Sequence, residues 1–176
     1  MGMKKSKKIA LCAIFSALSV LMLFAGAVVD VLSMTMTAIA SLLISVVMIE
    51  IGGVYPWLTW GVTSALSLLL LPNKYPAILY VLIMGIYPIL KERFERLHYV
   101  ISWILKFSVF NTGLLLLITA TKYIFYLSDS SADFTIPFLI LGNLAFFLYD
   151  IALSKLILLY IVKGRKRLGL KNYFEN

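Results

Sequence analysis

Six long apolar segments, separated by short polar breaks, dominate this sequence. They are residues 9–29, 34–51, 55–71, 76–90, 99–127 and 136–162. About 20 apolar residues in a helix are enough to cross the hydrocarbon core of a bilayer. The chain is 62% hydrophobic and only 14% charged over 176 residues, and a soluble fold of this size could not bury so much apolar surface. We therefore predict an all-α integral membrane protein, a single transmembrane domain over residues 1–176 that forms a bundle of six helices in the lipid bilayer.

Two segments leave alternatives open. Segment 76–90, with about fifteen residues, is marginal for crossing the bilayer. It either borrows length from its flanks or forms a broken or re-entrant pair with segment 55–71, and neither choice moves a terminus. Segment 9–29 follows a run of lysines, as in a signal peptide, but is too long for the apolar region of one. We expect it to be retained as the first helix.

Lysine and arginine residues gather on one side of the predicted bundle. Lys74 and Lys122 are expected on the opposite side, and Lys106 and Lys155 fall within segments. All the others share a side with the two termini and the loop 91–98: Lys4, Lys5, Lys7, Lys8, Lys91, Arg93, Arg96, Lys163, Arg165, Lys166, Arg167 and Lys171. Cytoplasmic loops carry an excess of Lys and Arg, so this pattern predicts cytoplasmic N- and C-termini. The net charge of +8 is thereby a topology signal, and we expect no nucleic-acid partner.

Ionisable side chains within the apolar segments are candidates for function, because they are costly in hydrocarbon. At helical rise, Asp150 and Asn111 fall at nearly equal depth on neighbouring helices, with Lys106 about one turn below. We predict a buried polar cluster of Lys106, Asn111 and Asp150, with an ion pair between Lys106 and Asp150. The alternative is an interhelical clamp that binds no ligand. Lys155 is expected to snorkel to the cytoplasmic headgroups.

The outer half of the bundle has its own concentration of polar and aromatic residues. Aromatic rings with a few hydrogen-bonding groups suit a pocket for a small planar or amphipathic molecule. Tyrosine and tryptophan also collect at membrane interfaces as simple anchors, and that interpretation stays open. The candidates are Ser33, Thr35, Thr37, Asn73, Lys74, Tyr75, Tyr80, Thr121, Lys122, Tyr126 and Asn143.

Catalysis and ATP hydrolysis find no support in the sequence. The only histidine, His98, falls in the loop 91–98, and no set of Ser, His and Asp residues can be assembled within the membrane. Cys12 is the only cysteine, which excludes an internal disulfide and a cysteine-based metal site. No Gly-rich phosphate loop is present. We predict neither enzyme activity nor a cofactor, and an energy source outside this chain.

The first segment carries a local packing motif. Ala13 and Ala17 are one turn apart, and two small residues at this spacing let another helix approach closely, which drives association in lipid. The partner helix is either another segment of this chain or a second protein.

Taken together, several features resemble the substrate-binding S component of energy-coupling factor (ECF) transporters, the small vitamin-uptake subunits of many bacteria. The features are the chain length, the six spans, the basic start from Lys4 to Lys8, the cytoplasmic termini and the Ala13 to Ala17 motif. The resemblance implies a multi-pass protein of a bacterial plasma membrane. It also implies that Ala13 and Ala17 dock on a transmembrane coupling subunit that is bound to two ATPase subunits.

The same resemblance implies a site for a vitamin or related small molecule on the outward half. The positions that meet this description are Asn73, Lys74, Tyr80, Lys122, Tyr126 and Asn143, with Asp150 and Asn111 beneath them. Lys74 and Lys122 suit an anionic substrate. Two other functions remain open: a non-transporting scaffold subunit of a cell-wall or sporulation complex, and a small transporter that uses an ion gradient through Asp150.

Overall fold

The computed structural model describes residues 5–120 and 136–164, and all the regular structure in these ranges is helical. The helices are α1 (Lys5–Val28), α2 (Ser33–Glu50), α3 (Tyr55–Leu70), α4 (Tyr75–Leu79), α5 (Tyr87–Phe94), α6 (Tyr99–Thr119) and α7 (Ile136–Leu159). A 3-10 turn, Asp30–Leu32, joins α1 to α2, and π-helical turns lie at Tyr80–Met84 and Tyr160–Gly164. The predicted end of the fifth segment, residues 121–127, lies outside the described residues, as do Lys4, Arg165, Lys166, Arg167 and Lys171.

Four helical stretches of the described chain are long and apolar enough to cross a membrane: Lys5–Val28, Asp30–Glu50, Tyr99–Thr119 and Leu139–Lys163. Many large apolar side chains on these helices are exposed, among them Leu21, Ile104 and Leu148. Helix α7 presents most of its length to the outside. These properties are compatible with a multi-pass membrane protein, because lipid replaces protein as the surroundings of the outer faces.

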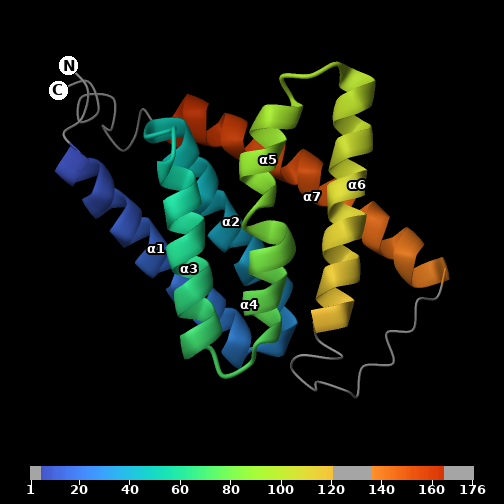
Figure 1. Cartoon of the computed structure of the whole chain (residues 1–176), viewed down its shortest axis with the longest axis horizontal. Helices are drawn as coiled ribbons and strands as arrows, with labels where there is room; N and C mark the ends of the chain where they lie inside the picture. Colours follow the sequence, from blue (N-terminus) through green and yellow to red (C-terminus); the bar gives the residue numbers. More distant parts are fainter. Residues whose placement is uncertain (1–4, 121–135, 165–176) are drawn as a thin grey trace.

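The helices run alternately up and down, and α7 crosses the bundle obliquely (Figure 1). The start of α1, the α2–α3 turn, the α5–α6 turn and the end of α7 lie at one end of the bundle. We call this the basic end, because it carries the described basic residues of the termini and of the α5–α6 region: Lys5, Lys7, Lys8, Arg93, Arg96 and Lys163. The opposite end holds the α1–α2 and α3–α4 turns.

Small polar side chains line the packing between α1, α2 and α3. The buried faces include Ser16 and Ser19 on α1, Thr37 and Ser41 on α2, and Thr63 on α3. Small residues let helix backbones approach closely, which favours association in lipid. The hydroxyl of Thr37 donates to its own helix, at 2.7 Å from the carbonyl oxygen of Ser33. Leu23 and Ala27 on α1 and Ala40 and Ile44 on α2 add buried apolar side chains to this packing.

The fourth apolar segment forms a broken helix. Helices α4 and α5 follow one another in the same direction across the bundle (Figure 1), and the π-helical turn and Gly85 separate them. Pro88 has no amide hydrogen and interrupts the backbone bonding there. The predicted segment 76–90 also ended too early, because α5 continues to Phe94. Lys91 therefore belongs to a helix and not to the predicted loop 91–98.

Candidate functional site

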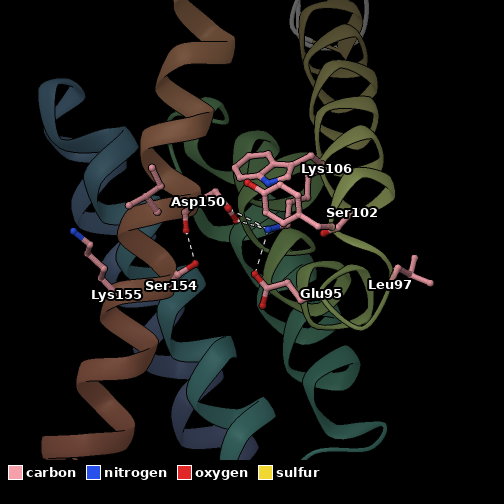
Figure 2. A pocket seen from close by; sticks show the side chains of 10 residues that line it. Glu95, Leu97, Ser102, Lys106, Asp150, Ser154 and Lys155 are labelled. Atoms are coloured by element: carbon pink, nitrogen blue, oxygen red, sulfur yellow. Dashed lines mark hydrogen bonds and ion pairs between the residues drawn. The ribbon is translucent and has the colours of Figure 1, made fainter.

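Asp150 on α7 is the centre of a charged network near the basic end of the bundle. Its carboxylate accepts hydrogen bonds from Tyr87 and Lys91 on α5 and from Lys106 on α6. Lys106 Nζ lies 3.1 Å from Asp150 Oδ2, so the ion pair predicted between these two residues is present. Both side chains are 5% exposed, and Figure 2 shows them meeting between α6 and α7. The buried carboxylate is thus matched by opposite charge, as apolar surroundings require.

Glu95 completes this network from its rim. Glu95 Oε1 lies 2.9 Å from Lys91 Nζ and 3.2 Å from Lys106 Nζ. The side chain of Glu95 is 50% exposed, whereas that of Lys91 is 3% exposed. Two buried ammonium groups therefore share one buried carboxylate and one carboxylate that reaches the outside. We call the set of Tyr87, Lys91, Glu95, Lys106 and Asp150 the Asp150 network.

Helical spacing explains why these side chains converge. Tyr87, Lys91 and Glu95 are four residues apart at the C-terminal end of the broken helix, and residues at this spacing share one helix face. On α7, the hydroxyl of Ser154 donates to the carbonyl oxygen of Asp150 at 2.8 Å. Side chains from α5, α6 and α7 therefore meet at Asp150 and hold these three helices together.

A pocket of about 490 Å³ lies beside this network. Its walls come from the α5–α6 turn, the first turns of α6 and the middle of α7: Glu95, Leu97, Tyr99, Ser102, Trp103, Lys106, Asp150, Ile151, Ser154 and Lys155. Figure 2 shows Lys106, Ser102 and Glu95 on one side and Ser154 and Lys155 on the other. The pocket therefore belongs to the basic end of the bundle, opposite to the end where the sequence predicted a ligand site.

Two pocket residues have no polar partner within the described part of the chain. Ser102 is 6% exposed, and its hydroxyl makes no hydrogen bond within residues 5–120 and 136–164. Lys155 is exposed, as expected for a snorkelling side chain, and its ammonium makes no ion pair within these ranges. Trp103 stacks on Phe107, and the ammonium of Lys106 lies 5.0 Å from the centre of the Trp103 ring. The pocket thus combines two ammonium groups, an aromatic wall and an unused hydroxyl.

Asn111 lies apart from the Asp150 network, contrary to the predicted cluster. Its side-chain nitrogen donates to Asn143 Oδ1 at 3.0 Å, and the nitrogen of Asn143 returns a bond to Asn111 Oδ1 at 3.1 Å. Asn143 precedes Asp150 by about 10 Å of helix. The sequence analysis placed Asn111 and Asp150 at nearly equal depth because it treated α6 and α7 as upright helices. Helix α7 is instead oblique (Figure 1). The structure therefore contains two polar contacts between α6 and α7 where the sequence predicted one cluster.

The predicted ligand residues of the outer half are largely occupied by contacts within the chain. Asn73 donates to Asp30 Oδ1 at 3.0 Å. The ammonium of Lys74 donates to the carbonyl oxygens of Leu68 and Leu71, at 2.8 and 2.7 Å. These bonds fasten the turns at that end of the bundle.

Tyr80, the third of these residues in the chain, is fully buried and packs with the apolar side chains of the core. Lys122 and Tyr126 lie outside the described residues.

Ala13 and Ala17 are both exposed on α1. The opposite face of the helix packs inside the bundle through Cys12, Ser16 and Ser19. The small-residue motif is thus not used in packing between the described helices.

Sequence reasoning missed three members of the Asp150 network: Tyr87, Lys91 and Glu95. Lys91 and Glu95 lie in a basic stretch that was assigned to topology. The usable signal was the four-residue spacing from Tyr87 through Lys91 to Glu95, which continues the helix past the predicted end. Only the position of Asp150 on α7, fixed by tertiary structure, explains why Lys91 is buried.

The part of the chain that the structure describes contains no group of three or more His, Cys, Asp or Glu residues arranged to bind a metal ion. Neither a protein-family model, nor a curated protein, nor a solved structure matches this chain.

Proposed function

We propose that this chain is a multi-pass protein of a bacterial plasma membrane, with its basic end in the cytoplasm. Four apolar helices and the many exposed apolar side chains support insertion into a bilayer. The basic end carries the described lysines and arginines of the termini and the α5–α6 region, whereas Lys74 is at the opposite end. The excess of positive charge in cytoplasmic loops gives this orientation.

Within that membrane, the chain acts as the substrate-binding subunit of an ECF-type importer. It captures a vitamin or related small molecule on the outer side and docks on a coupling subunit that is bound to two ATPase subunits. One observation carries this proposal: Ala13 and Ala17 are exposed on α1, while the opposite face of α1 packs in the bundle. An uncovered pair of small residues, one turn apart, lets a helix of a second protein pack closely there.

The proposed outer ligand site of this importer involves fewer residues than the sequence predicted. Asn73 and Lys74 are bonded to other parts of the chain, and Tyr80 is buried in the core. Asn143 is likewise bonded to Asn111 through both its side-chain oxygen and its nitrogen. Lys122 and Tyr126 remain as the proposed ligand contacts. An anionic group on the substrate would pair with Lys122.

A scaffold subunit of a membrane complex is the second candidate. The same bonds of Asn73 and Lys74 favour it, because they serve the fold and leave these residues unavailable to a ligand. In this function the Asp150 network is a clamp, and α1 docks on a membrane protein without an ATPase. Ion-gradient transport through Asp150 receives less support, since two lysines and a tyrosine already occupy its carboxylate.

Affinity capture of the tagged full-length chain from its native membranes tests the docking proposal. We expect an ATPase-bound membrane subunit to co-purify with the wild type, and Ala13→Leu to reduce its recovery at least tenfold. Ala152→Leu places the same bulk on the exposed face of α7 and serves as the matched control. Recovery of a membrane partner without ATPases would favour the scaffold. Equal recovery of the ATPase-bound subunit by both variants would overturn docking through Ala13.

A further inference from the structure

The pocket beside the Asp150 network carries an excess of positive charge. Lys106 and Lys155 line it and Lys91 lies behind it, whereas Asp150 and Glu95 supply the only carboxylates among its described lining residues. We propose that this pocket binds a phosphate group, either in a phospholipid headgroup or as free phosphate. The proposal concerns the basic end of the bundle and depends on neither the partner of α1 nor the outer ligand.

Donors for a phosphate are present among the lining residues. Lys106 on α6 and Lys155 on α7 line the pocket, and ammonium groups form strong charge-assisted hydrogen bonds to phosphate oxygens. Figure 2 shows the side chain of Lys155 extending away from Lys106, so it has to rotate toward the pocket to contact a ligand. Ser102 adds a hydroxyl that has no partner in the described residues, although its residue is 6% exposed. Because Ser102 lines the pocket, a bound phosphate oxygen could accept a hydrogen bond from its hydroxyl.

The start of α6 adds a second source of positive potential. Tyr99 and Ser102 of its first turn line the pocket. The preceding residue, His98, makes no side-chain hydrogen bond that would cap this helix. The N-terminus of a long helix favours anions through its free amide groups and its dipole. The helix terminus and the two lysines therefore favour the same sign of charge.

Glu95 balances positive charge in the pocket when no ligand is bound. Its carboxylate contacts both Lys91 and Lys106 and is half-exposed, whereas Asp150 is buried beneath it. An incoming phosphate can replace the Glu95 carboxylate on Lys106, so the buried ammonium stays neutralised throughout. A cation would instead have to displace Lys106 from between the two carboxylates. An anion is therefore the ligand that this arrangement accepts.

Two features connect the pocket with a lipid headgroup. Leu97, Trp103 and Ile151 give it an apolar part, which suits the glycerol and first acyl carbons of a phospholipid. In the proposed orientation, the basic end also lies at the cytoplasmic headgroup layer, where anionic lipids attract basic residues. A free phosphate would use the polar part of the same pocket.

The experiment uses the full-length protein in a neutral detergent. Native mass spectrometry measures retention of phosphatidylglycerol and of diacylglycerol with the same acyl chains, which lacks a phosphate, and equilibrium dialysis measures inorganic phosphate. We expect phosphatidylglycerol to be retained in preference to diacylglycerol. If inorganic phosphate binds as well, the phosphate group alone is sufficient; if only phosphatidylglycerol binds, the ligand is the lipid headgroup. Failure of both to bind overturns the proposal.

Variants of opposite expected effect locate the site. Lys155→Gln and Ser102→Ala should each weaken binding, Lys155→Gln by about tenfold, because a charge-assisted hydrogen bond is lost. Glu95→Gln should strengthen it, because the competing carboxylate is removed. Lys163→Gln, near the end of α7 and outside the pocket, is the matched control for Lys155→Gln. Equal binding by these two glutamine variants, or weaker binding by Glu95→Gln, would overturn the proposed site.

Docking through α1 and phosphate binding in the pocket can be tested separately. Ala13→Leu alters the exposed face of α1 and should leave retention of phosphatidylglycerol unchanged. Lys155→Gln should in turn leave recovery of the α1 partner unchanged.

Discussion

The ammonium of Lys91 and the carboxylate of Asp150 form a buried ion pair across 59 residues of sequence, and their side chains are 3% and 5% exposed. The pair joins the last turns of α5 to the middle of α7. It requires α5 to continue past the apolar segment, so that a lysine at the segment's edge reaches the interior. A charge that sequence analysis assigns to a loop thus becomes part of the packing between helices.

Replacing Asp150 with asparagine should strongly destabilise the protein. The change leaves Lys91 and Lys106 buried with only the half-exposed Glu95 as an anionic partner. Removing one partner of a buried ion pair costs about 3–5 kcal/mol. Thermal unfolding of the detergent-solubilised protein should show a midpoint lowered by several degrees.

The double variant Asp150→Asn with Lys106→Gln distinguishes charge imbalance from loss of packing. In Asp150→Asn, two buried ammonium groups lose their buried carboxylate partner. The double variant removes one of these ammonium groups, so we expect it to be more stable than Asp150→Asn alone. A double variant as unstable as the sum of its two single variants would show that the charges act independently.

Lys91 and Arg93 provide a second test of the same burial. Lys91→Met removes a cation that Asp150 and Glu95 both contact, and should lower the unfolding midpoint. Arg93→Met changes an exposed basic residue on the same helix and should leave the midpoint within about a degree, since surface substitutions are usually worth less than about 0.5 kcal/mol. Similar midpoints for both variants would mean that Lys91 is not buried.

Hydropathy and charge predicted the helical nature of the chain because they depend on local sequence. Six apolar segments were expected, and the described helices follow them closely, for example α2 at Ser33–Glu50 against residues 34–51. The break near Gly85 was not predicted at its position. Pro88 is visible in the sequence near this break. The close approach of Trp60 to Gly85 is a tertiary contact, which the sequence does not show.

The candidate site was predictable only in part. Lys106 and Asp150 stand out as charges within apolar segments, and their contact is present. Lys91 does not stand out in this way, because a lysine at the edge of a span looks like the other basic residues that set the orientation in the membrane. Asn111 was placed wrongly because sequence gives depth along an upright helix, and the tilt of α7 comes from packing that sequence periodicity does not describe.

Gly85 should tolerate no side chain. A Cβ at this position would lie 2.7 Å from the carbonyl oxygen of Tyr80 and 2.8 Å from Trp60 Cδ1. Gly85→Ala therefore forces the broken helix away from α3, at a cost of about 1–3 kcal/mol. Gly61→Ala is the control, because its Cβ would meet no atom within 4 Å. Comparable unfolding midpoints for the two variants would contradict the close approach at Gly85.

The Asn111 and Asn143 pair should behave as a coupled contact between α6 and α7. Asn143→Leu leaves the amide of Asn111 without its interhelical partner and should cost about 1 kcal/mol. The double variant with Asn111→Leu removes both amides and should recover part of that loss. A double-mutant cycle of unfolding free energies measures the coupling, and a coupling energy of zero would mean that the two amides do not interact.

The orientation in the membrane can be checked with single cysteines, since Cys12 is the only natural one. In a Cys12→Ser background, Val31→Cys places an exposed thiol at the α1–α2 turn, and Leu97→Cys places one at the α5–α6 turn of the basic end. With the basic end in the cytoplasm, a membrane-impermeant maleimide should label Val31→Cys in intact cells. It should label Leu97→Cys only after the membrane is permeabilised. The reverse pattern would place the termini outside and would also move the proposed phosphate site to the outer leaflet, so this measurement decides which leaflet the pocket faces.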